Sequence, residues 1–68
     1  MLYEDLLHSS SPMRSGYLAD VLKAAVTEAL YSGKPQGISV TETLAVFSLT
    51  EVERYAVQRE AIERLRGK

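Results

Sequence analysis

The chain has 68 residues, of which nine are acidic and eight are Lys or Arg, and it has no cysteine. A chain of this length buries only about 60% of the surface that it exposes when unfolded, so its own core is marginal. The lack of cysteine excludes disulfides and thiolate metal sites, and the chain lacks the excess of Lys and Arg that a nucleic-acid binder usually shows. We therefore expect one small domain that is stabilised by helix packing and by assembly, as a homo-oligomer or with other proteins.

The first residues, MLYEDLL, are acidic and short, whereas a secretory signal begins with basic residues and has an apolar run of about 7 to 15 residues. No stretch approaches the roughly 20 apolar residues of a membrane span. We expect a protein that is made in the cytoplasm and contacts no membrane.

Residues 1–12 are predicted to be an N-terminal arm and linker, and residues 13–68 a single domain. The apolar residues of the arm fall on one side of a short helix: Leu2, Tyr3, Leu6 and Leu7. A serine run ending at Pro12 then breaks the pattern. Because so short a helix is unstable alone in water, the arm either packs back on the domain or binds a partner. Its four apolar residues are candidates for partner binding.

Between Gly16 and Ser32 the apolar residues recur every three or four positions, which is the stripe of an amphipathic helix. We predict a helix over residues 17–32. Gly33 suits the left-handed backbone position just after a helix, and Pro35 cannot continue one.

The following segment, GISVTETLAVFS, is rich in β-branched residues, which favour strands. We predict strands over residues 38–41 and 44–47, joined by a turn at Glu42 and Thr43. This turn lacks the Gly or Asn that favours positive φ in tight hairpins. The pairs that would face each other across the hairpin are Val40 with Ala45 and Ile38 with Phe47.

The same segment also permits a third helix. Ser39 and Glu42 have the spacing of a capping box, and Val40, Leu44 and Phe47 share one helical face. We favour the hairpin, which makes the fold α+β with two antiparallel helices. The third helix would make it an all-α domain.

The last segment is predicted to be a helix over residues 50–66. Thr50 and Glu53 match a capping box, and Glu60 with Arg64 is a favourable i, i+4 pair. Its predicted buried stripe consists of Val52, Tyr55, Ala56, Ile62 and Leu65.

Three predicted segments follow one another here. The first is a helix that ends with the residues ALYSGK at Lys34, the second is about a dozen residues with strand propensity that end at Phe47, and the third is a helix that begins LTEVERY. This order, over residues 17–66, resembles the W-type head-to-tail joining proteins of tailed phages. The resemblance implies a helix, hairpin, helix fold and a structural role in the virion neck, after synthesis in the host cytoplasm. Copies would form a ring that binds the portal protein and the next neck or tail protein.

A second and more local resemblance implies a different function. Leu44 to Phe47, followed by Arg54 and Ala56, resembles a stretch of the haemolysin-modulating Hha family. That family implies a helix over residues 40–47 and a small all-helical regulator or inhibitor that acts by binding another protein.

The candidate site residues near the C-terminus are Arg59, Arg64 and Arg66. In a joining protein they would face channel DNA or an acidic subunit; otherwise they complement the helix dipole and keep the chain soluble. The one histidine, His8, lies beside the serine linker with no cysteine near it, and we expect a solvated residue of the arm rather than a metal ligand. We expect no metal, no cofactor and no enzymatic activity.

Overall fold

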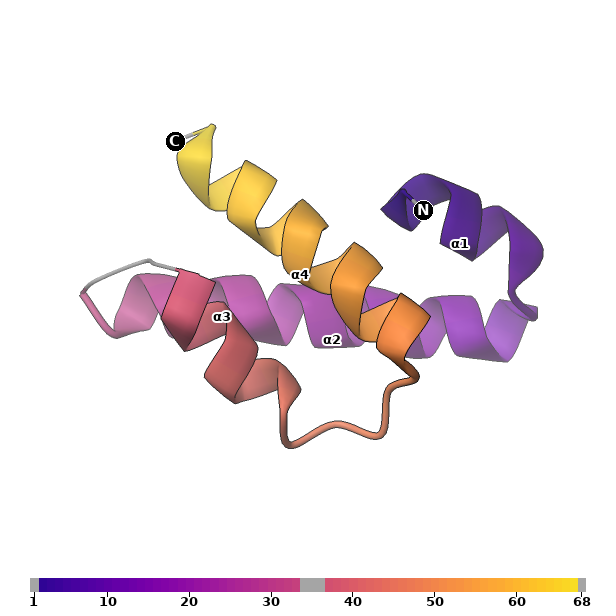
Figure 1. Cartoon of the computed structure of the whole chain (residues 1–68), viewed down its shortest axis with the longest axis horizontal. Helices are drawn as coiled ribbons and strands as arrows, with labels where there is room; N and C mark the ends of the chain where they lie inside the picture. Colours follow the sequence, from indigo (N-terminus) through magenta and orange to yellow (C-terminus); the bar gives the residue numbers. More distant parts are fainter. Residues whose placement is uncertain (1, 34–36, 68) are drawn as a thin grey trace.

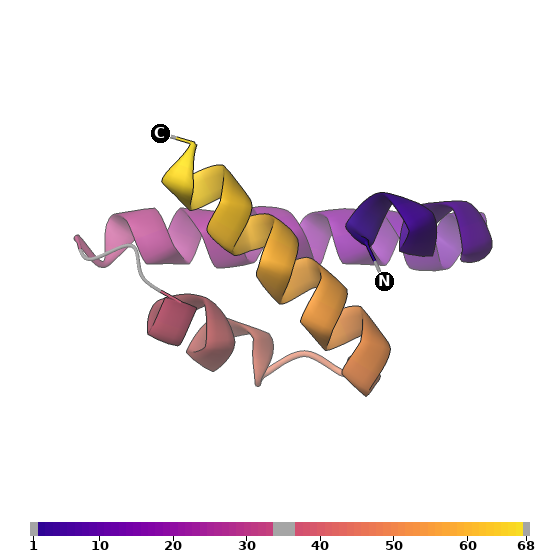
Figure 2. The same ribbon diagram turned by 45° about the horizontal axis from the view of Figure 1, so that its top comes forward.

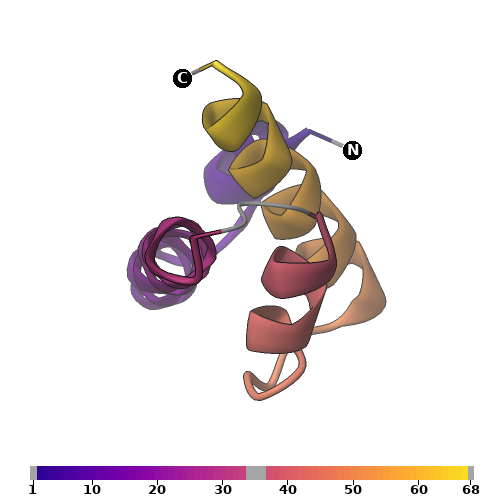
Figure 3. The same cartoon turned by 90° about the vertical axis from the view of Figure 1, so that its left-hand side faces the viewer.

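The computed structural model describes residues 2–33 and 37–67, and these residues form four α-helices and no strand (Figure 1). The helices are α1 (Tyr3–Ser9), α2 (Pro12–Tyr31), α3 (Gly37–Leu44) and α4 (Glu51–Arg66). The long α2 runs the length of the molecule, and α4 crosses it obliquely (Figure 2). Viewed along α2, the helices α3 and α4 form a second layer beside it (Figure 3). The short α1 turns back to pack against α4 and α2.

The predicted hairpin is wrong, and with it the α+β fold class. Residues 38–41 lie in α3, and residues 44–47 lie at its end and in the turn that follows. The Phe47 amide donates to the Leu44 carbonyl oxygen at 3.1 Å, so the backbone continues as a helical turn. The all-α alternative describes the fold correctly.

Burial explains why the helix forms. Val40 and Leu44 lie one helical turn apart and are both fully buried, and Phe47 packs against the same core. Ile38, which the hairpin would pair with Phe47, is instead 68% exposed. Strand propensity largely measures how a side chain packs in its context, and here the available core matches the helical period.

The helix α2 begins at Pro12 and ends at Tyr31, whereas the predicted range was 17–32. The Ser11 hydroxyl caps it by accepting a hydrogen bond from the Arg14 amide at 3.2 Å, and proline is well suited to the first helical position. The serine run therefore starts a helix as well as ending one. At the other end, the predicted left-handed Gly33 is confirmed by its φ of 77°. Lys34 and Pro35 lie outside the described residues.

The predicted helix at the C-terminal end is confirmed as α4. The Glu53 amide donates to Thr50 Oγ1 at 3.1 Å, and the Thr50 amide donates to Glu53 Oε1 at 3.0 Å, which completes the capping box. The predicted pair of Glu60 and Arg64 also forms, with 3.5 Å between the charged atoms.

The core lies where α2, α3 and α4 meet, with α1 closing one end. Its members are Tyr3, Leu6, Leu18, Val21, Leu22, Ala25, Ala29, Val40, Leu44, Ala56, Val57 and Ala61. The three contributed by α4 are small side chains, which allow its backbone to lie close to α2. In residues 2–33 and 37–67 no helix is both long enough and apolar enough to cross a bilayer.

Candidate interaction surface

Two apolar side chains in the first half of α4 lie outside the core. Val52 and Tyr55 are 48% and 57% exposed, so their assignment to the buried stripe is wrong, whereas Ala56 is fully buried as predicted. Ile62 and Leu65 are partly buried at the edge of the core. Four exposed residues and the partly buried Ile62 recur along α4 at alternating spacings of three and four, and we call them the outer stripe: Val52, Tyr55, Arg59, Ile62 and Arg66.

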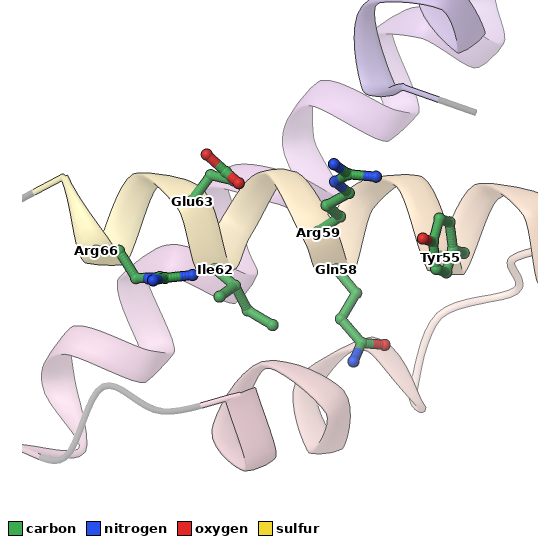
Figure 4. Close-up of a pocket in the computed structure, with 6 residues that line it drawn as sticks. All are labelled: Tyr55, Gln58, Arg59, Ile62, Glu63 and Arg66. Atoms are coloured by element: carbon green, nitrogen blue, oxygen red, sulfur yellow. The ribbon is translucent and has the colours of Figure 1, made fainter.

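A shallow depression of about 300 Å³ lies along the outer stripe (Figure 4). Its lining residues all belong to α4 and are Tyr55, Gln58, Arg59, Ile62, Glu63 and Arg66. Figure 4 shows Gln58 and Ile62 on the side of α4 that faces α3, and Arg59 and Glu63 on the opposite side. The depression is therefore framed by both flanks of a single helix.

The chemistry of this depression suits binding to another protein. An exposed tyrosine ring and an isoleucine provide apolar contact area, and the two exposed arginines at positions 59 and 66 provide charge. Tyrosine and arginine are enriched at protein interfaces, where they supply much of the binding energy. Among the residues that the structure describes, no group of three His, Asp or Glu side chains could hold a metal ion.

An ion pair between α2 and α4 fixes the direction of α4. Arg14 Nε donates to Glu53 Oε2 at 2.6 Å, and Arg14 Nη2 donates to Glu53 Oε1. Arg14 Nη2 also donates to the Ser48 carbonyl oxygen at 3.0 Å. Glu53 is buried, and the hydrogen bonds from Arg14 lower its pKa from 4.5 to about 2, with a further contribution from Thr50.

Two aromatic rings extend this contact to the loop between α3 and α4. The Arg14 guanidinium lies over the Tyr17 ring, 4.8 Å from its centroid. Tyr17 in turn meets Phe47 edge to face, with 6.3 Å between the ring centroids. The first turns of α2 therefore hold both the loop and the start of α4, which orients the outer stripe.

In the structure the N-terminal arm forms α1 and packs against the rest of the domain. Tyr3 and Leu6 are buried, Leu7 is partly buried against the core, and Leu2 remains about half exposed. Burial raises the pKa of the Tyr3 phenol. The Ser15 hydroxyl donates to the Leu7 carbonyl oxygen at 3.1 Å and ties α1 to α2. A partner could reach Tyr3 and Leu6 only if α1 detached.

Replacing Leu6 with alanine is expected to lower the free energy of unfolding by about 1 to 2 kcal/mol. The loss is limited because α1 is a terminal helix that can detach while the remainder stays folded. Urea denaturation followed by circular dichroism measures it. Leu2→Ala is the matched control, and equal losses in the two variants would contradict the observed packing of α1.

The three predicted arginines do not form one cluster. Arg64 pairs with Glu60 and lines a separate cavity of about 440 Å³, which also borders Tyr3. Arg59 and Arg66 belong to the outer stripe. Only these two are placed to act together on a ligand of that face.

Comparison of the chain with protein-family models, curated proteins and solved structures finds no match. The site therefore rests on its own geometry. The sequence prediction missed Gln58 and Glu63, and it placed Val52 and Tyr55 in the core. The signal in the sequence that could have distinguished the outer stripe from the core residues of α4 is its alternating spacing of three and four, which continues through Arg59. The buried small residues of α4 do not follow this spacing.

Proposed function

We propose that this protein is a small all-helical regulator or inhibitor that acts by binding another protein chain through the outer stripe of α4. The observation that carries the proposal is the exposure of Val52 and Tyr55 on a helix whose opposite face is fully packed. Burying such side chains contributes roughly 25 cal/mol per Å² of apolar surface. A domain with so small a core gains stability if a partner covers them.

The regulator proposal needs no hairpin. The joining role in a phage neck, with contacts to the portal, the tail or channel DNA, was implied by an order of elements in which a hairpin lies between two helices. The correction to α3 removes that support. The alternative resemblance implied a helix over residues 40–47, and α3 (Gly37–Leu44) with the turn after it is compatible with that.

Photo-cross-linking in the cells that make the protein tests this function. A benzophenone amino acid at position 55 is expected to form adducts with a protein chain. The matched control is position 31, where Tyr31 is 88% exposed at the end of α2, and it is expected to give none. A folded position-55 variant that gives no adduct, or the same adducts as position 31, would refute the proposed function.

A further inference from the structure

We infer that the outer stripe binds the outer stripe of a second copy of this chain, with the two α4 helices antiparallel about a two-fold axis. This inference rests on the proposed function, because it names the partner of the same surface. Four properties of α4 support it: residue spacing, the shape of the depression, the order of charges, and length.

The spacing of the outer stripe is that of a coiled-coil seam. Val52, Arg59 and Arg66 are seven residues apart, and Tyr55 and Ile62 fall between them in the a and d pattern. A repeat of 3.5 residues keeps one stripe turned toward a partner helix. The buried face of α4 packs against α1, α2 and α3, so this seam, apart from the partly buried Ile62, faces outward.

The residues that line the depression form two overlapping sets with the spacing of coiled-coil holes. In a coiled coil each hole is made by residues at i, i+3, i+4 and i+7. The first set is Tyr55, Gln58, Arg59 and Ile62, and the second is Arg59, Ile62, Glu63 and Arg66. In an antiparallel pair, Tyr55 of the second copy enters the first hole and Val52 of the second copy enters the second. The two-fold axis repeats both contacts.

Charges along the stripe complement one another only in the antiparallel arrangement. Tyr55 of one copy then lies over Arg59 of the other, which is a cation–π contact. Glu51, at the start of α4, comes near Arg66 at the end of the second α4, and the helix dipoles oppose. A parallel pair would instead stack Arg59 on Arg59 and Arg66 on Arg66, and like charges in contact are unfavourable.

The length of α4 sets the expected strength. Its 16 residues make a stripe about 24 Å long, which is short for a standard interface. We expect a reversible dimer with a dissociation constant on the order of 10 to 100 μM.

Sedimentation equilibrium of the full chain over a range of concentrations tests the pairing. Tyr55→Ala is expected to raise the dissociation constant by at least about tenfold, because each dimer loses the contact twice. Tyr31→Ala, at the exposed tyrosine of α2, is expected to leave it unchanged. A chain that remains monomeric, or a dimer that Tyr55→Ala does not weaken, overturns the inference.

Single cysteine variants test the direction of the helices, since the chain has no cysteine of its own. In the antiparallel register the two copies of position 58 are offset by only about 3 Å along the helix axis, whereas those of position 52 are about 15 Å apart. Gln58→Cys is therefore expected to form a disulfide-linked dimer and Val52→Cys is not. The reverse result indicates a parallel pair and overturns the proposed geometry.

The two proposals fail in different ways. If position 55 cross-links to a different protein and the purified chain is monomeric, self-association is refuted while the regulator function stands. If position 55 gives no adduct in cells, the regulator function is refuted. An adduct of twice the chain mass, lost on Arg59→Glu, supports self-association, whereas an adduct with a different protein supports the regulator function.

Discussion

Leu44→Ala is expected to lower the free energy of unfolding by about 3 kcal/mol, the largest effect of any single substitution considered for this chain. Leu44 is fully buried at the end of α3, in the core that α2 and α4 complete. Alanine removes its apolar contacts and leaves a cavity that the surrounding helices fill only in part. Since a core this small supplies only about 3 to 5 kcal/mol, the variant should be largely unfolded near body temperature.

The matched control for this prediction is Ile38→Ala in the same helix. Ile38 is exposed, so its replacement is expected to change stability by less than about 0.5 kcal/mol. Chemical denaturation of both variants, with trimethylamine N-oxide to extend the folded baseline, measures the difference. The hairpin predicts the reverse ranking, because Leu44 would lie on the face opposite Ile38 and Phe47. A larger loss of stability for Ile38→Ala than for Leu44→Ala would therefore support the predicted strands.

The ends of the helices could be predicted where the signals are local. The capping box of Thr50 and Glu53, the pair of Glu60 and Arg64, and the left-handed Gly33 each depend on residues within one helical turn. The start of α2 was missed although its signal is local too. Ser11 and Pro12 can either form a linker that ends one helix or cap the start of the next helix. Which of the two occurs depends on the residues that follow them.

The state of residues 38–47 could not be predicted because distant contacts decide it. Val40 and Leu44 fit both a strand and a helix as far as local propensity is concerned. The core that buries them is made by α2 and α4, which are separate in sequence. The ion pair of Arg14 and Glu53 spans 39 residues and leaves no local pattern at all.

The outer stripe could be found only after the core of α4 was known. Large apolar residues are usually predicted to be buried in the core, and Tyr55 was predicted to be buried for this reason. In the structure the small residues Ala56, Val57 and Ala61 fill the close contact of α4, and Val52 and Tyr55 remain outside. Residue size alone therefore misplaced Val52 and Tyr55, whereas Ala56 is buried and Ile62 and Leu65 pack against the core as predicted.

Glu53→Gln is expected to lower the free energy of unfolding by about 2 kcal/mol. Glutamine keeps the shape of the side chain, but it leaves the Arg14 guanidinium without its counter-charge and replaces charge-assisted hydrogen bonds by neutral ones. Glu51→Gln removes an exposed acid from the same turn and is expected to cost no more than about 0.5 kcal/mol. Similar losses in these two variants would mean that the ion pair contributes nothing beyond the helix dipole.

The same ion pair makes stability depend on pH. The pKa of Glu53 falls from 4.5 to about 2 on folding, so between these values the unfolded chain binds the proton and the folded chain does not. The stabilisation is therefore complete above pH 4.5 and is lost as the pH falls toward 2. We expect this group to account for about 2 kcal/mol of the loss, less than the full shift implies because solvent screens the Arg14 side chain, which is 36% exposed. Urea midpoints measured down to about pH 3 should fall more steeply for the wild-type chain than for Glu53→Gln, and parallel curves would show that another group causes the acid sensitivity.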